Sequence, residues 1–81
     1  MKTTESVRQW LVSYLAEIFT IQPTEVDTSV TFTEWGLESG IAMGLVGELE
    51  QWIGFELPLD ILMQYPTIDS LSEYVSTATR L

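Results

Sequence analysis

The chain contains neither cysteine nor histidine, and only three of its 81 residues are Lys or Arg. Without cysteine it can form no disulfide, no thiolate metal site and no cysteine nucleophile. Without histidine it lacks the commonest general base and a common metal ligand. We therefore expect no catalytic residues and no metal site, and a chain that is not an enzyme by itself.

Positive charge is scarce: twelve Asp and Glu residues leave a net charge of −9. Repulsion between like charges disfavours nucleic acid and anionic membranes as partners, so we expect neither. A basic protein partner fits better, because complementary charge speeds encounter. Acidity that only keeps a small domain soluble is the alternative interpretation.

Long hydrophobic runs are missing too. No stretch approaches the roughly 18 consecutive apolar residues of a membrane-spanning helix. Met1-Lys2 leads into polar residues rather than into the apolar segment of a signal peptide. We expect a cytoplasmic protein. A hydrophobic content of 46 % suits a packed core, and residues 1–81 are long enough for one small domain.

Apolar residues at three- and four-residue steps predict a first helix that is capped by Thr3 or Thr4 and ends near Phe19. Pro23 forbids its simple continuation and suits a short turn of helix. The long connection over residues 20–38 has apolar residues of its own, which we expect to fix it to the core. They are Ile21, Val26, Val30, Phe32 and Trp35.

The second helix is expected from Ser39 to Ile53, and Gly54 suits its C-terminal cap. Three glycines, Gly40, Gly44 and Gly47, weaken this helix by roughly 1 kcal/mol each relative to alanine. Close packing or simple tolerance explains Gly44 and Gly47 in one interpretation, and room for a partner in the other. The apolar face consists of Ala42, Leu45, Val46, Leu49, Trp52 and Ile53.

A short third helix is expected through Asp60–Met63, with Pro58 in its first turn and Tyr65-Pro66 at its end. Thr67 then caps a fourth helix. The apolar face of that helix consists of Ile68, Leu71, Tyr74, Val75 and Ala78. The fold class is therefore all-α: a small four-helix bundle of three long helices and one short one, with a long loop between the first and second helices.

Ser39 stands at the start of the second helix, directly after Gly36-Leu37-Glu38. A helix N-terminus has unpaired N–H groups and a positive dipole end, which favour a phosphate. No histidine or lysine lies near Ser39 in the sequence to act as a base, so it is a weak nucleophile on its own. It suits a modification catalysed by another protein, and a simple helix cap is the alternative.

Three separated segments resemble acyl carrier proteins. Trp10–Leu15 followed by Ile21–Asp27 is similar to the first helix and loop opening of that family. Phe32-x-x-Trp35-Gly36-Leu37-Glu38-Ser39 is similar to its Phe-x-x-Leu-Gly-Leu-Asp-Ser stretch. Leu57-Pro58-x-x-x-Leu62-x-x-Tyr65-Pro66-Thr67-Ile68-x-x-Leu71 resembles the tail typical of polyketide-synthase-type carriers.

The resemblance implies that Ser39 holds a covalent 4′-phosphopantetheine arm, whose thiol carries acyl intermediates as thioesters in polyketide or lipopeptide biosynthesis. The implied partners are a phosphopantetheinyl transferase, an acyl-loading enzyme (a fatty acyl-AMP ligase or an acyltransferase), and a ketosynthase or other assembly-line domains. Glu38, Gly40, Glu48 and Glu50 are the residues expected to meet partners. The alternative is a docking or scaffold module with a degenerate, unmodified carrier fold.

Two longer segments, Trp10–Ala16 and Gly44–Gly54, resemble carriers associated with fatty acyl-AMP ligases. Other positions depart from the family pattern. Glu38 replaces an aspartate, and Gly40 replaces the usual leucine or isoleucine after the serine. These departures affect the expected partner and the efficiency of modification more than the fold.

Overall fold

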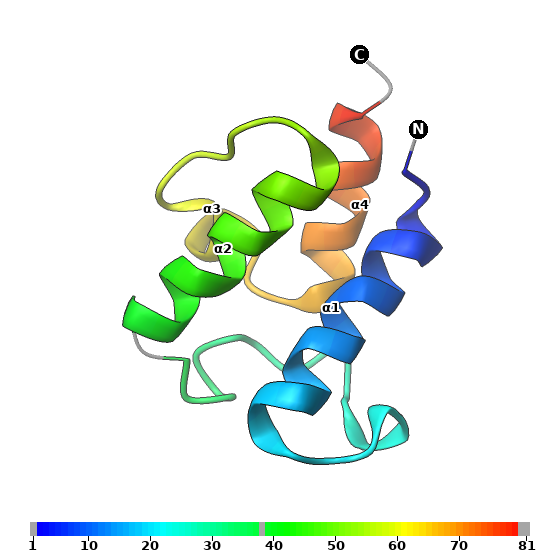
Figure 1. The fold of residues 1–81 in the computed structure, drawn as a ribbon, viewed down its shortest axis with the longest axis vertical. Coiled ribbons are helices and arrows are strands. Elements are labelled where there is room, and N and C mark those ends of the chain that lie inside the picture. The colour runs from blue at the N-terminus through cyan, green and yellow to red at the C-terminus, as the bar shows by residue number, and fades with distance from the viewer. Residues whose placement is uncertain (1, 38, 80–81) are drawn as a thin grey trace.

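The computed structural model describes residues 2–37 and 39–79 of the chain (Figure 1). Its helices are α1 (Thr4–Phe19), α2 (Ser39–Ile53), α3 (Ile61–Gln64) and α4 (Ile68–Ala78). A single 3-10 turn, Pro23–Glu25, lies in the connection between α1 and α2. The predicted all-α bundle of three long helices and one short one is confirmed, with the long loop in its predicted place.

The helix ends follow the predicted caps. Thr3 accepts a hydrogen bond from the backbone N–H of Ser6, and Thr67 accepts one from Ser70; in both cases the serine hydroxyl accepts the N–H of the cap in return. Each pair closes the first turn of its helix, α1 and α4 respectively. Gly54 follows α2 with φ of +89°, a conformation that glycine adopts without strain.

The core lies between α1 and α4, which run side by side, and α2, which lies across them in Figure 1. Leu11 and Leu15 of α1, Leu45 and Leu49 of α2 and Leu71 of α4 are fully buried. Residues outside the long helices complete the core. The buried hydrophobic set is Val7, Leu11, Val12, Leu15, Ala16, Val26, Phe32, Leu45, Leu49, Leu57, Ile61, Ile68, Leu71 and Val75.

One detail of the predicted helices is wrong, and one feature of α4 was not predicted. Helix α3 begins at Ile61, so Pro58 lies before it; the Pro58 carbonyl accepts the N–H of Ile61 at 3.1 Å instead of opening the helix. On α4, Ser72 and Ser76 are buried although they are polar, whereas the predicted Ala78 is only half-buried. Small side chains let two helices approach closely, which suits a helix that packs along α1.

The long loop is fixed to the start of α4 by its backbone. The N–H of Phe32 donates to the carbonyl of Pro66 at 2.7 Å, and the N–H of Asp69 donates to that of Thr28 at 3.2 Å. Between these two bonds lies an isolated antiparallel bridge of Thr31 with Thr67. Phe32 is only 3 % exposed, so its side chain is part of the core, as predicted.

The two described ends of the chain meet at the top of Figure 1, where the hydroxyl of Thr79 donates to the carbonyl of Lys2 at 3.2 Å. Helix α2 begins at the other end of the molecule, beside the long loop. Within residues 2–37 and 39–79, no helix is long and apolar enough to cross a membrane.

Replacing Thr67 tests the cap of α4. Thr67→Ala removes the oxygen that accepts the Ser70 N–H at 3.1 Å. We expect the free energy of unfolding to fall by about 1 kcal/mol in urea denaturation. The control is Thr77→Ala, an exposed position inside the same helix, where alanine should leave stability unchanged or raise it slightly. Equal losses in both variants would contradict a role for the cap.

Candidate functional site

The site is the turn that leads into α2. The N–H of Trp35 donates to the carbonyl of Thr31, that of Gly36 to Thr33 at 2.9 Å, and that of Leu37 to Phe32 at 3.3 Å. Gly36 has φ of +75°, which side chains rarely adopt, so any other residue would be strained there. The turn is thus compact and is built on the buried Phe32, and α2 begins two residues after it at Ser39.

Trp35 anchors this turn from the side. Its ring stacks on Phe19 at the end of α1, with the ring centroids 5.4 Å apart. The indole N–H is buried and has no hydrogen-bond partner among the described residues. Packing therefore holds Trp35, as the sequence predicted for the anchors of this loop. Glu38, which was expected to meet partners, lies outside the described residues.

The glycines of α2 face open space. A Cβ atom added at Gly40 or Gly47 would meet no heavy atom of the described chain within 4 Å. At Gly44 it would meet only the hydroxyl of Tyr14, at an ordinary contact distance of 3.6 Å. Close packing therefore does not require a glycine at any of the three positions. The space beside the three glycines fits both simple tolerance and room for a partner.

The two acidic residues expected on α2 lie on different sides of the helix. The carboxylate of Glu50 accepts the N–H of Leu57 at 2.6 Å, so it holds the segment after α2 against the helix. Glu48 is exposed and acts on α1 instead: burial raises the pKa of the Tyr14 phenol, and the negative charge of Glu48 raises it further. The role of Glu50 escaped the sequence analysis, because a hydrogen bond to a backbone N–H leaves no sequence pattern.

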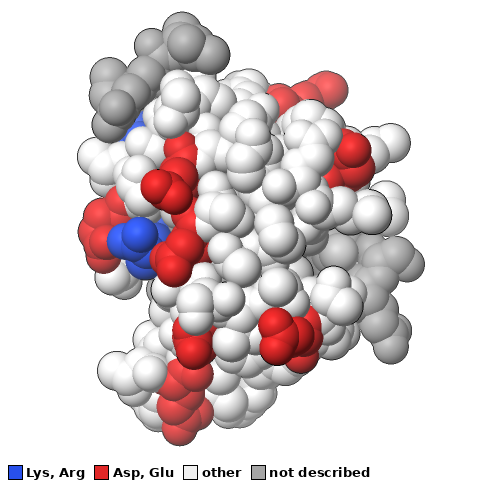
Figure 2. All heavy atoms as spheres, turned by 180° about the vertical axis from the view of Figure 1, so that it is seen from behind, with Lys and Arg blue, Asp and Glu red and all other residues white. Residues whose placement is uncertain are grey.

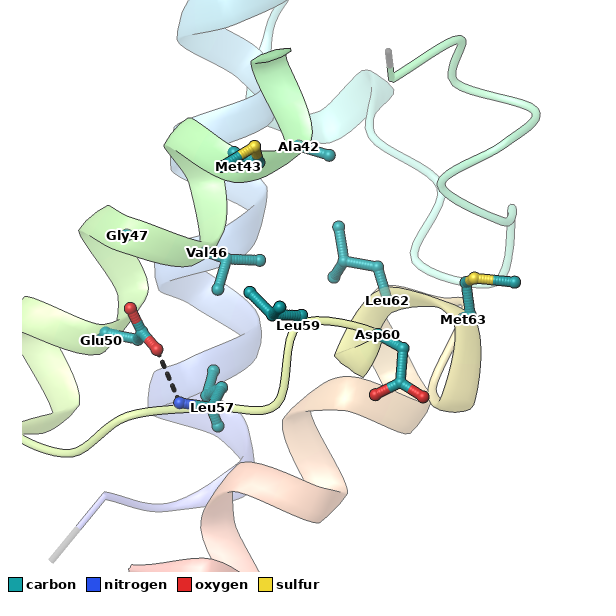
Figure 3. Close-up of a pocket in the computed structure, with 10 residues that line it drawn as sticks. All are labelled: Ala42, Met43, Val46, Gly47, Glu50, Leu57, Leu59, Asp60, Leu62 and Met63. Atoms are coloured by element: carbon teal, nitrogen blue, oxygen red, sulfur yellow. Dashed lines mark hydrogen bonds between the residues drawn. The ribbon is translucent and has the colours of Figure 1, made fainter. Parts of the chain in front are cut away.

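A pocket of about 370 Å³ lies between α2, the segment 57–60 and α3 (Figure 3). Its walls are almost entirely apolar, and its volume falls within the range of small-molecule sites. It is lined by Ala42, Met43, Val46, Gly47, Glu50, Leu57, Leu59, Asp60, Leu62 and Met63.

Three of these wall residues are exposed to solvent. Leu59 is 100 %, Met63 84 % and Met43 69 % exposed. Apolar side chains gathered at the mouth of a pocket indicate a surface that meets another molecule. The sequence analysis missed Leu59 and Met63, since helical periodicity says little about a short linker and a helix of one turn.

The acidic side chains of the described residues form no metal centre. Figure 2 shows Asp and Glu side chains spread over the face opposite to that of Figure 1. In the part of the chain that the structure describes, no group of three or more acidic residues is placed to hold a metal ion.

Sequence comparison finds the family described as "Phosphopantetheine attachment site", whose model matches residues 9–75. The acyl carrier protein TtuC of Teredinibacter turnerae is 31 % identical over 74 residues, which are 91 % of this chain and 85 % of TtuC. A phenolphthiocerol/phthiocerol polyketide synthase chain of Mycobacterium tuberculosis is 36 % identical over 70 residues. Those residues are 86 % of this chain and 4 % of that synthase.

Solved carrier structures have the same fold. The acyl carrier protein Asl1650 from Anabaena sp. PCC 7120 matches with a TM-score of 0.90 and 30 % identity over 95 % of this chain and 88 % of its own. Asl1650 is described as having a variant phosphopantetheinylation-site sequence. The acyl carrier protein LipD from Actinoplanes friuliensis matches with a TM-score of 0.81 and 31 % identity over 96 % and 87 % of the two chains.

The effect of Glu48 on Tyr14 is testable by titration. Glu48→Gln removes the negative charge, so the Tyr14 pKa should fall toward the ordinary value of about 10 while burial keeps it above that value. NMR titration of the tyrosine ring carbons measures it, with Glu56→Gln as the control. A Tyr14 pKa unchanged by Glu48→Gln, or lowered equally by Glu56→Gln, would show that Glu48 does not act on Tyr14.

Stability should follow the same titration. A tyrosine with a raised pKa in the folded state stabilises the fold below its unfolded pKa, and this contribution is lost as pH rises through the folded pKa. Glu48→Gln narrows the gap between the folded and unfolded pKa of Tyr14, so the alkaline loss of stability should begin at the same pH, become smaller and end at a lower pH.

Proposed function

Because this chain belongs to the phosphopantetheine-attachment family, we propose that Ser39 is the residue that holds the 4′-phosphopantetheine arm. Members of this family carry that arm covalently, and the chain is accordingly a carrier protein of the acyl or peptidyl kind. The observation that supports Ser39 is its position: α2 begins there, directly after the turn built on Phe32 and Gly36. An attached phosphate at this point lies at the positive end of the helix dipole.

The chemistry is divided between the chain and its partners. The chain has no histidine, so the transferase that attaches the arm supplies the base. The arm supplies the thiol that a cysteine-free protein lacks, and the thiol holds the cargo as a thioester. The chain itself catalyses nothing in this proposal: it presents the arm to successive enzymes.

The pocket supports an apolar cargo. From α2 the pocket is lined by Ala42, Met43 and Val46 of the first two turns, the part of the helix that begins at Ser39. The wall offers aliphatic and thioether side chains, with the charged groups of Glu50 and Asp60 at its edge. Such a wall fits a fatty acyl group better than a charged malonyl or an aminoacyl group.

We propose polyketide or lipopeptide biosynthesis as the setting, with a fatty acyl-AMP ligase as the loading enzyme. The relatives named as an acyl carrier protein and a polyketide synthase support the biosynthetic class. The likeness of Trp10–Ala16 and Gly44–Gly54 to ligase-associated carriers supports the loading enzyme. Glu38, Glu48 and Glu50 are the proposed contacts for basic partners, and Gly40 is a further position of partner recognition. A ketosynthase or another assembly-line domain acts downstream.

Modification is tested by intact mass. After treatment with coenzyme A and a broad-specificity phosphopantetheinyl transferase, the mass of the chain should rise by one phosphopantetheine unit. Ser39→Ala should abolish this rise, and Ser13→Ala, an exposed serine on α1, should leave it intact. An unchanged mass under conditions that convert a reference carrier would favour the alternative, an unmodified docking or scaffold module.

The loading enzyme is tested at Gly40, which is exposed and faces open space. Gly40→Leu restores the bulk usual in the family, and it should slow loading by the cognate ligase about tenfold, mainly through faster dissociation. Gly40→Ala is the control, because it strengthens the helix without adding bulk. The fold should survive both changes.

The acyl group that the holo protein accepts tests the proposed loading enzyme separately from the carrier assignment. A holo protein that accepts malonyl or aminoacyl groups, but no fatty acyl group from any such ligase, would contradict the proposed loading enzyme while leaving the carrier assignment in place.

A further inference from the structure

Three aromatic rings form a continuous stack on the side of α2 away from the pocket. Trp10 of α1 stacks on Tyr14 with 5.3 Å between the ring centroids, and on Trp52 of α2 with 5.6 Å. The interplanar angles are 17° and 15°. All three residues are half-buried, so the stack, which we call the aromatic ladder, lies at the surface between α1 and α2.

A cation already occupies one end of the ladder. The ammonium group of Lys2 lies over the ring of Trp52, 4.1 Å from its centroid. The chain has only three Lys and Arg residues. Of these, Arg8 binds Glu5 and Asp69. Lys2, one of the few cationic residues of a strongly acidic protein, therefore lies over an aromatic ring at the surface.

The surroundings of the ladder favour positive charge as well. The exposed Glu48 stands one helical turn before Trp52 on α2, so it lies on the same side of that helix as the ring that Lys2 covers, and its negative charge also acts on Tyr14. Aromatic faces next to a carboxylate attract guanidinium groups, because the ring quadrupole and the negative charge act in the same direction. Arginine fits better than lysine, since its flat, weakly hydrated group stacks on rings.

We propose that the aromatic ladder is a docking surface for an arginine side chain of a partner protein, which displaces Lys2 from Trp52. Lys2 then acts as an internal competitor that covers the ring until the partner binds. This surface goes beyond the proposed carrier function: it lies on the Glu48 side of α2, whereas the pocket lies on the Glu50 side. Its test needs no phosphopantetheine arm.

The experiment follows the three indole N–H signals of the apo protein by NMR. The probe is the blocked peptide acetyl-Gly-Arg-Gly-amide, and the matched peptide with citrulline removes the charge but keeps the shape. Signals of Trp10 and Trp52 should shift and saturate with the arginine peptide. Trp35 stacks on Phe19 outside the ladder, so its signal is the internal control and should stay in place.

Competition by Lys2 gives the decisive comparison. Lys2→Met should tighten binding of the arginine peptide about two- to fivefold, which is the worth of one exposed cation–π contact. Arg8→Gln is the control, because it removes one positive charge from a residue that binds Glu5 and Asp69 instead of Trp52. It measures how much the change in net charge alone tightens peptide binding. An unchanged Trp35 indole signal in both variants confirms that each is folded.

Four results would overturn the proposal. Equal shifts with the citrulline peptide would show that charge is irrelevant, and an equal shift at Trp35 would show diffuse attraction. Equal tightening by Lys2→Met and Arg8→Gln would show that Lys2 does not compete for the ring. Ladder shifts on concentrating the protein without peptide would identify a second copy of the chain as the occupant, against the proposed partner.

Discussion

The backbone tie between the long loop and the start of α4 is the constraint on which the site depends. The bonds Phe32–Pro66 and Asp69–Thr28 flank the Thr31–Thr67 bridge, and they fix a loop that otherwise contains only one short turn of helix. Phe32 fills the core from this point, and the following turn ends at Gly36. The place where α2 starts is therefore set by α4, which is the last helix of the chain.

The two exposed sides of helix α2 differ in their chemistry. The glycines leave its exposed faces open, and its fully buried anchors are Leu45 and Leu49. On one side Glu50 holds the 57–60 segment and the apolar pocket opens; on the other side Glu48 borders the aromatic rings of α1. A carrier that must meet several enzymes in turn benefits from a helix with two chemically distinct sides.

The sequence predicted the helices and their caps because these are local: Thr3, Thr67 and Gly54 act within one turn of their own position. Features that depend on distant segments were missed. The buried Ser72 depends on the packing of α4 along α1, and the contact of Glu50 with Leu57 depends on the path of the linker. The exposure of Leu59 and Met63 follows from a helix of one turn, which is too short to bury a full apolar face. Of the candidate site, the sequence placed Ser39 at the start of α2, while the pocket beside it needed the structure.

The central claim is that this turn presents Ser39 for attachment of the arm, and site mapping tests it most directly. The native chain, treated with coenzyme A and a phosphopantetheinyl transferase, is digested and its fragments are sequenced by tandem mass spectrometry. The account predicts a phosphopantetheinyl group on the fragment that contains Ser39, with the other serines unmodified. Attachment to another serine, or none at all while a reference carrier is fully converted, would contradict it.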